Sequence, residues 1–203
     1  EDPHGNTRPD SATPRALAIR EDGWRRRIIP MTPATSPMPI ALIVDNSQAM
    51  APAIADLRKA VSTFVQTVNG LGPVAVFTVG DRPTVLQEYT TAREELTEAA
   101  TRLFHAPGSG ATLLDTISEV SRGLSKRESD RATIVVVTGE HTEFGNLHYA
   151  TVLDRLRDSE AMMYAVVLIN PNGSLATDEE RNRATVLDRG PRESGGMRIH
   201  VLR

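Results

Sequence analysis

Apolar runs alternate with segments of helical periodicity from residue 40 onward, and this alternation constrains the fold most strongly. The runs cover residues 40–44, 74–79, 132–138 and 163–169. Continuous apolar runs of this length are typical of strands that are buried on both faces of a parallel sheet. Because strands that alternate with helices are joined by right-handed crossovers, the pattern predicts an α/β fold with a doubly wound, mainly parallel sheet of about six strands.

Two further segments complete the predicted sheet at its edges. Residues 85–89 form a short polar strand that follows residues 74–79 too closely for a helical crossover. We therefore expect this strand to pair antiparallel at one edge. Residues 198–202 are predicted as a last strand near the other edge. Helices are expected where apolar residues recur at helical spacing, within residues 52–68, 96–104, 113–124 and 149–156.

The N-terminal part of the chain has a different composition. Residues 1–16 are polar and rich in Pro, Asn and Asp, which predicts a disordered leader. In residues 17–39, two strand-like segments flank Asp22 and Gly23, a pair typical of a hairpin turn, and a proline-rich linker follows. Residues 40–203 are then expected to form the main domain.

Composition and charge exclude several classes of function. The net charge of -3 gives no basic field for nucleic acid. The chain has no cysteine, which excludes disulfides, thiolate metal sites and a cysteine nucleophile. No apolar run approaches the roughly 20 residues that cross a bilayer, so no membrane insertion is expected in this segment. The chain begins at Glu1 rather than at Met, which indicates a processed or excised piece.

Oxygen-bearing side chains follow the predicted strands in three loops. Asp45 and Ser47 come directly after the first apolar run, Thr112 lies in a glycine-rich turn before a helix, and residues 138–142 follow the third run. The carboxyl ends of parallel strands meet at one edge of a sheet, where such folds place their sites. Carboxylate and hydroxyl oxygens suit a hard cation such as Mg²⁺. The same residue types also cap helices without any metal.

These loops resemble the metal-ion-dependent adhesion site of the von Willebrand factor type A (VWA) domain, whose pattern is Asp-x-Ser-x-Ser with a distant Thr and a distant Asp. Asp45, Ser47 and Thr112 match three ligands of that pattern. Ala49 replaces the second Ser, and Gly139 replaces the last Asp. The resemblance, which covers residues 40–203, implies a Rossmann-like fold and a metal site that is partial or lost.

The two replacements lead to a specific expectation about the metal. Mg²⁺ needs charge compensation from its ligands because it dehydrates reluctantly. With Asp45, Ser47 and Thr112 as the remaining protein ligands, the site is expected to bind Mg²⁺ weakly or not at all. Glu140 is a further candidate ligand, one residue late and one methylene longer than the missing Asp. No other cofactor is expected.

The resemblance also bears on the ends of the domain and on its location. The hairpin in residues 17–29 looks like the start of a bacterial, commonly exported subgroup, which implies a periplasmic, cell-surface or secreted protein, with a cytoplasmic one left open. Residues 190–196 resemble a late loop of the family. The family usually has one further C-terminal helix, and this chain stops at Arg203 before it, so the final helix is expected to be missing.

The leading interpretation is a non-catalytic, adhesion-type VWA module that binds an unknown protein partner through the loops at the carboxyl edge of the sheet. Glu140, Glu143 and Phe144 are the candidate partner-binding residues. With little or no metal to neutralise Asp45, Glu140 and Glu143, the rim is expected to be negative and to favour a basic or amide-rich partner. No catalytic residue is assigned, because the dinucleotide, Walker and nucleophile-elbow motifs are absent.

Two alternatives remain open. In the first, the chain is a Mg²⁺-dependent phosphoryl-transfer enzyme that uses Asp45. Such chemistry needs a second nearby acid and a phosphate-binding lysine, whereas Lys59 and Lys126, the only lysines, each lie well along a predicted helix. In the second, the domain is a structural spacer within a larger exported protein.

Overall fold

The computed structural model describes residues 18–27, 35–127, 129, 131–169 and 177–202. The chain divides into two compact units, Glu1–Ser36 and Pro37–Arg203, each of which is described by itself. None of the helices in the described ranges has the length and hydrophobicity that a membrane crossing requires.

The first unit contains a β-hairpin. β1 (Ile19–Glu21) pairs antiparallel with β2 (Trp24–Arg26). Asp22 and Gly23 at the turn have φ values of 52° and 83°. Positive φ at both positions is the conformation that an Asp-Gly pair favours in tight hairpins, so the predicted turn is confirmed. The predicted leader, residues 1–16, and most of the proline-rich linker lie outside the described residues.

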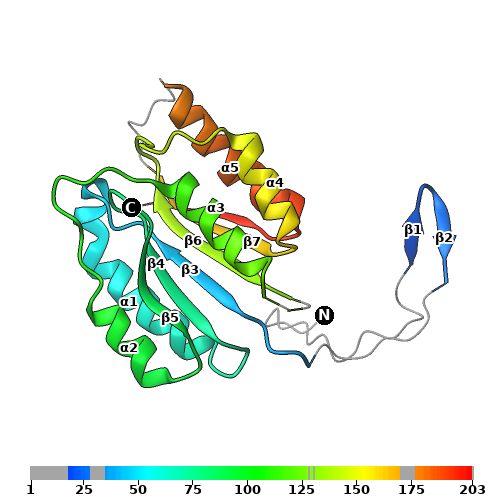
Figure 1. Ribbon diagram of the computed structural model, residues 1–203, viewed down its shortest axis with the longest axis horizontal. Coiled ribbons are helices and arrows are strands. Elements are labelled where there is room, and N and C mark those ends of the chain that lie inside the picture. The colour runs from blue at the N-terminus through cyan, green and yellow to red at the C-terminus, as the bar shows by residue number, and fades with distance from the viewer. Residues whose placement is uncertain (1–17, 28–34, 128, 130, 170–176, 203) are drawn as a thin grey trace. The chain divides into compact units, whose positions relative to one another are not determined.

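The second unit is built on a six-stranded sheet with the strand order β5-β4-β3-β6-β7-β8 (Figure 1). β5 pairs antiparallel with β4, and all the other neighbours pair in parallel. The strands are β3 (Ile40–Val44), β4 (Val74–Thr78), β5 (Thr84–Thr90), β6 (Thr133–Gly139), β7 (Met162–Leu168) and β8 (Arg198–Val201). The mainly parallel sheet with one antiparallel edge strand is therefore confirmed.

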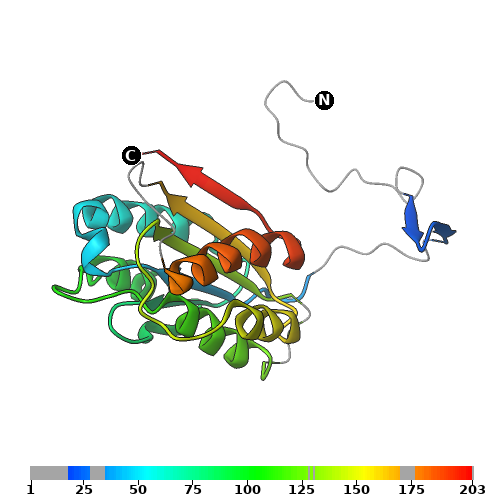
Figure 2. The same cartoon turned by 90° about the horizontal axis from the view of Figure 1, so that it is seen from above.

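Helices cover both faces of this sheet (Figures 1 and 2). A 3-10 helix (Gln48–Ala53) leads into α1 (Ile54–Thr67), and α1 and α2 (Arg93–Thr101) lie on one face of the sheet. The other face is covered by α3 (Leu113–Leu124), α4 (Tyr149–Asp158) and α5 (Asp178–Ser194). In the central strand β3, Ala41 and Ile43 belong to the core on the side of α3, α4 and α5. The alternate residues Ile40, Leu42 and Val44 pack against α1 and α2. Both faces of β3 are thus buried, as its continuous apolar run predicts.

The helix α5 replaces a predicted loop. Residues 190–196 were expected to form a late loop, but α5 continues to Ser194, and Gly195 ends it with a left-handed φ of 85°. At the start of α5, Thr177 and Glu180 form a capping box, in which each side chain accepts the backbone N–H of the other. This cap and the burial of one side of the helix outweigh the cost of the proline inside it.

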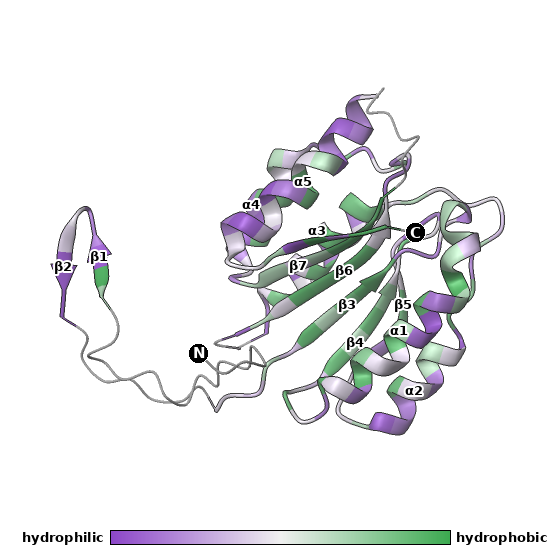
Figure 3. Ribbon diagram, turned by 180° about the vertical axis from the view of Figure 1, so that it is seen from behind, coloured by the Kyte–Doolittle hydropathy of each residue, from purple (hydrophilic) through white to green (hydrophobic). Residues whose placement is uncertain are grey.

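One part of the sheet has no helix over it among the described residues. On the α1 side of β6 and β7, Val135, Val137 and Leu168 are only partly buried. Ile199 and Val201 of β8 are exposed beside them. Figure 3 is seen from this side and shows the hydrophobic strands next to α1 and α2. The side chains of β3 are therefore fully buried on both faces, and burial decreases toward β8.

Truncating a side chain of the central strand is expected to destabilise the domain strongly. Ile43 is 0 % exposed, so Ile43→Ala leaves a cavity and is expected to lower the free energy of unfolding by about 2–5 kcal/mol. Ile199 is 48 % exposed, and Ile199→Ala, the same chemical change, is expected to cost about 0.5 kcal/mol or less. Urea unfolding measures both values. Equal losses would contradict the placement of β3 at the centre of the core.

Candidate functional site

The carboxyl ends of three neighbouring parallel strands lie level with one another. Val44, the last residue of β3, pairs with Thr78 of β4 and with Val137 of β6. Asp45 and Thr138 therefore emerge together, and the N–H of Asp45 donates to the carbonyl oxygen of Val137 at 2.8 Å. After β3 the chain adds β4 and β5 on one side of β3, and it then crosses over to add β6 on the other side. This is the switch point of the sheet, where open α/β sheets form their sites.

Asp45 is completely buried at this point, and both of its carboxylate oxygens are hydrogen-bonded. Oδ1 accepts the backbone N–H of Ser47 at 3.0 Å. Oδ2 accepts from the hydroxyl of Thr138 at 2.5 Å and from Nη2 of Arg183 at 3.1 Å. It also lies 2.8 Å from Nε2 of His141. A single carboxylate after β3 thus binds groups from β6, from the loop after β6 and from α5.

Arg183 joins Asp45 to a second buried carboxylate. It extends inward from the second turn of α5 and is 3 % exposed. Nη1 donates to Oε2 of Glu143 at 2.8 Å, and Nη2 donates to Asp45 and to the carbonyl oxygen of Gly139, the latter at 3.2 Å. Nη2 also donates to the hydroxyl of Thr138. Two carboxylates face this guanidinium, so their charge compensation depends on Arg183.

Glu143 ties the loop after β6 to the start of α3. It is 2 % exposed, and its Oε1 accepts the N–H of Gly145 at 3.0 Å and that of Leu114 at 3.5 Å. Leu114 lies in the first turn of α3, where N–H groups lack partners within the helix and a negative charge is favourable. One carboxylate therefore contacts α5 through Oε2 and α3 through Oε1.

Burial and pairing shift the pKa values of the two carboxyl groups in opposite directions. Burial alone would raise the pKa of Asp45, but the hydrogen bond from His141 and the charge of Arg183 outweigh it and hold that pKa well below its ordinary value. Burial dominates for Glu143 and raises the pKa of its carboxyl, although Arg183 and the N–H of Gly145 oppose the rise. Asp45 is thus the carboxylate whose charged form the folded state favours.

His141 connects the buried cluster with the surface. Its side chain is 14 % exposed, and Nδ1 lies 3.2 Å from the carbonyl oxygen of Thr142 while Nε2 faces Asp45. The hydroxyl of Thr142 donates to Oε1 of Glu180 at 3.0 Å, which ties the same loop to the first turn of α5. The loop after β6 is therefore bound to α5 twice: at the surface through Thr142 and in the interior through Glu143.

Backbone hydrogen bonds join the loops at this edge into one continuous surface. The N–H of Ala106 donates to the carbonyl oxygen of Asn46 at 2.8 Å. The N–H of Phe144 donates to the carbonyl oxygen of Ala111, also at 2.8 Å. A surface that is fixed in this way loses little freedom when it binds a partner. We call it the loop surface and define it as residues 45–50, 106–112 and 139–147.

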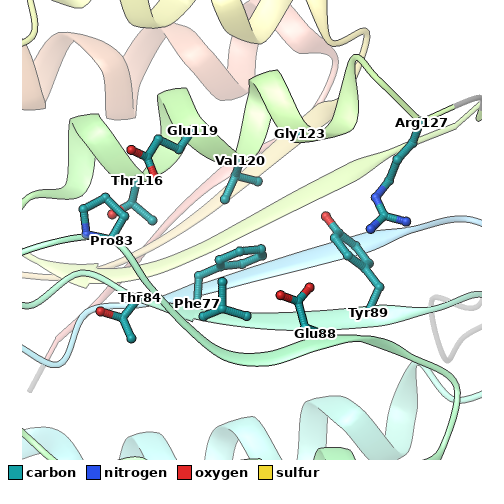
Figure 4. Close-up of a pocket in the computed structure, with 11 residues that line it drawn as sticks. Phe77, Pro83, Thr84, Glu88, Tyr89, Thr116, Glu119, Val120, Gly123 and Arg127 are labelled. Atoms are coloured by element: carbon teal, nitrogen blue, oxygen red, sulfur yellow. The ribbon is translucent and has the colours of Figure 1, made fainter.

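A separate hollow of about 250 Å³ lies between β5 and α3 (Figure 4). Its wall includes Phe77, Tyr89, Val120, Glu88, Glu119 and Arg127. The guanidinium carbon of Arg127 lies 4.0 Å from the centre of the Tyr89 ring, and burial raises the pKa of Tyr89 to about 12. The three charged side chains of this hollow are exposed, in contrast to those at the switch point.

The sequence from β3 to the loop after β6 identifies the protein family to which the chain belongs. A family model described as von Willebrand factor type A domain matches residues 40–141, half of the chain. The chain belongs to the VWA domain family. The matched residues include the strands β3, β4 and β6 and, in the loops, Asp45, Ser47, Thr112 and His141. No curated protein sequence matches the chain.

Solved structures share this fold. BatB from Bacteroides thetaiotaomicron has a TM-score of 0.65 at 12% identity, covering 81% of this chain and 90% of that chain. An aerotolerance-related membrane protein from Bacteroides fragilis has a TM-score of 0.61 at 18% identity, covering 81% and 91%. The PilB minor pilin from Streptococcus sanguinis has a TM-score of 0.57 at 10% identity, covering 88% and 60%. At such identities the likeness shows the common VWA fold.

The residues that match the VWA metal pattern have other roles in this fold. Asp45 binds Arg183, as described above. The hydroxyl of Thr112 donates to the carbonyl oxygen of Gly80 at 3.0 Å. Ser47 is 1 % exposed, and its hydroxyl has no hydrogen-bond partner within the described part of the chain. Only the Ser47 hydroxyl among these three thus keeps all its bonding capacity.

The structure places the three candidate partner-binding residues differently. Phe144 is 62 % exposed on the loop surface. Glu140 is partly exposed, and its Oε1 lies 3.6 Å from Nη2 of Arg198 on β8. Glu143 is buried, which contradicts its expected place on a negative rim, because Arg183 and α3 hold its carboxylate inside.

A divalent cation does not fit beside Asp45 in this VWA domain. The carboxylate oxygen that faces the switch point already binds Arg183, and Gly139 offers only its carbonyl oxygen, which binds the same guanidinium. Within the described ranges, no group of three or more His, Cys, Asp or Glu side chains could hold a metal ion. Arg183 thus occupies the carboxylate of Asp45, one of the three residues that match the family's metal pattern.

Sequence reasoning did not identify Arg183, because 138 residues separate it from Asp45. Two signals could have found it. Thr177 and Glu180 have the spacing of a capping box, and the apolar residues that follow continue a helical pattern. An arginine on the inward side of such a helix indicates a buried anion, because arginine is rarely buried without a charge partner.

Asp45→Asn is expected to weaken the acid dependence of stability. Because the pKa of Asp45 is depressed in the fold, its charge contributes stability above the unfolded value of 3.8, and this contribution is lost as the pH falls toward the folded pKa. The variant should therefore be less stable at pH 7 and lose less stability below about pH 4. Urea unfolding at neutral and acid pH measures both effects.

The control for this prediction is Asp154→Asn on α4, because the carboxylate of Asp154 is 65 % exposed. Its acid dependence is expected to equal that of the wild type. If the unfolding free energy of all three proteins declines equally on the acid side, the carboxylate of Asp45 does not have the role described here.

Proposed function

We propose that this VWA domain is a non-catalytic protein-interaction module that binds a protein partner through the loop surface. The observation that carries the proposal is the exposed ring of Phe144 on a fixed backbone. Its N–H donates to Ala111, and its ring packs so closely on Gly110 that a Cβ there would lie 2.4 Å from it. Exposed aromatic side chains held in this way are typical anchors of protein interfaces.

A second aromatic side chain lies at the same edge. Phe104 is 60 % exposed, and its carbonyl oxygen accepts Nδ2 of Asn46 at 3.1 Å. The guanidinium carbon of Arg58 lies 4.5 Å from the centre of its ring, which fixes one side of the phenyl group. Two separated aromatic anchors favour a partner with apolar side chains at more than one point.

The charges at this edge argue against the strongly negative rim that the sequence suggests. Asp45 and Glu143 are buried and both pair with Arg183, and Glu140 lies beside Arg198. The polar side chains of Gln48, Thr142 and Asn146 are exposed on the loop surface. The proposed partner therefore presents apolar groups flanked by hydrogen-bonding groups, rather than a run of basic residues.

The proposal assigns no phosphoryl transfer to Asp45. A carboxylate nucleophile has to reach the phosphorus atom, whereas Asp45 is 0 % exposed and has hydrogen bonds to both oxygens. Attack would require Arg183 to leave the cluster first. The buried carboxylate supports a structural role for Asp45 beneath the loop surface.

An exported location is part of the proposal. The similar structures include one described as a membrane protein and one described as a minor pilin. A module that holds another protein at the cell envelope or surface is consistent with both descriptions and with the adhesion-type interpretation of the sequence.

Photo-crosslinking within producing cells tests where the partner binds. A photoreactive residue at position 144 is expected to capture the partner, and one at position 71 is not, because Leu71 lies before β4 at the opposite edge of the sheet. Leu71 is 47 % exposed, which makes it a matched apolar control. Equal capture at both positions, or capture at position 71 alone, would contradict the proposal.

The captured partner then allows a quantitative test. Phe144→Ala is expected to raise its Kd by about tenfold or more, which corresponds to about 1.4 kcal/mol, because an interface anchor is lost. Leu71→Ala is expected to leave the Kd unchanged. Calorimetry with the purified partner measures both values.

A further inference from the structure

The guanidinium of Arg183 lies within a cage of oxygen atoms. Its terminal nitrogens contact Oδ2 of Asp45, the hydroxyl of Thr138, the carbonyl oxygen of Gly139 and Oε2 of Glu143. One nitrogen atom, Nε2 of His141, also lies 3.4 Å from Nη2. Carboxylate, hydroxyl and carbonyl oxygens are the donors that hard divalent cations such as Mg²⁺, Ca²⁺ and Mn²⁺ take. These oxygens come from β6 and from the loops after β3 and β6, so a cation among them holds separate segments together.

The cage needs a positive charge. Asp45 and Glu143 are 0 % and 2 % exposed, and water cannot replace a missing counter-ion there. A buried carboxylate that loses its partner strongly destabilises a protein. The side chain of Ser47, whose backbone N–H binds Asp45, adds a buried hydroxyl without a hydrogen-bond partner among the described residues.

We propose that Arg183 serves as the permanent cation of this site, and that its removal uncovers a binding site for a divalent cation between Asp45 and Glu143. Arginine keeps its charge at every physiological pH, and α5 carries it, so the loop edge is assembled without any metal. The inference is independent of whether the loop surface binds a protein, because it concerns only the interior of the site.

The fold explains how an arginine can fill this place. The capping box at Thr177 fixes the start of α5, and Val186 and Leu187 are buried on the sheet. Arg183 lies on the same inward side, one turn before these apolar residues. The guanidinium therefore reaches the cage from a helix whose position is set by its own cap and core contacts.

Thermal unfolding of the wild type, Arg183→Ala and Arg181→Ala in EDTA and in millimolar Mn²⁺ tests the proposal. Arg181 lies on the same helix with an exposed ion pair to Asp178, so its variant is the matched control. In EDTA, Arg183→Ala is expected to melt about 10 °C below the wild type. Mn²⁺ is expected to raise its Tm by about 5 °C and to leave the other two proteins within about 1 °C.

Two further measurements test the proposal: the binding of Mn²⁺ itself, and its loss when the two carboxylates are also replaced. Electron paramagnetic resonance is expected to show one bound Mn²⁺ per chain in Arg183→Ala and none in the wild type. Adding Asp45→Asn and Glu143→Gln to that variant is expected to abolish the bound ion. Binding that survives these changes places the ion elsewhere and overturns the proposal, as does Mn²⁺ binding to the wild type at equal strength.

A different measurement applies if Arg183→Ala does not fold in EDTA. Arg183→Ala is then refolded from urea with and without Mn²⁺, and circular dichroism measures the recovered structure. Recovery with Mn²⁺ alone supports the proposal, because the ion has replaced the missing charge. Failure to recover in both conditions, or a folded variant without any Mn²⁺ response, overturns it.

Discussion

The loop edge of this domain depends on the pairing of one guanidinium with two buried carboxylates. Asp45 directly follows the central strand, Glu143 binds the start of α3, and Arg183 comes from α5. None of the three is more than 3 % exposed, so the guanidinium and the two carboxylates depend on each other for charge compensation. The positions of the loops after β3 and β6 therefore depend on how α5 packs on the sheet.

An arginine and a metal ion give such a site different properties. A metal ion has coordination positions that a partner can fill, and it can leave. The guanidinium of Arg183 directs its terminal N–H groups to oxygens within the same chain and is 3 % exposed. The charge of Arg183 thus stabilises the interior of this VWA domain, whereas the proposed function assigns recognition to the exposed aromatic and polar side chains of the loop surface.

The sequence predicts the strands of this fold because their physical signals are local. The apolar run of β3, the short connection to β5 and the Asp-Gly turn of the hairpin each determine a structure from a few neighbouring residues. The position of Asp45 at the end of a buried strand follows in the same way. β3 agrees with the structure because burial on two faces leaves little choice of residue type, and the hairpin agrees because an Asp-Gly pair favours the positive φ values of its turn.

The partners of Asp45 could not be predicted in this way. A glutamate such as Glu143 is exposed in most proteins, and its burial here follows from Arg183, which is distant in sequence. Residues 190–196 contain glycine and proline, which favour loops locally, yet the burial of α5 overrides them. The site therefore depends on a long-range charge pairing that a local pattern does not contain.

The order of the segments in the chain has a consequence for how the domain folds. Arg183 follows Asp45 by 138 residues, and α5 is the last helix among the described residues. Both carboxylates are thus synthesised well before the charge that neutralises them, and they stay solvated until α5 docks. Because contacts so distant in sequence close a large loop at an entropic cost, they form slowly. The buried charge cluster beneath the loop surface is therefore expected to form late in the folding of the domain.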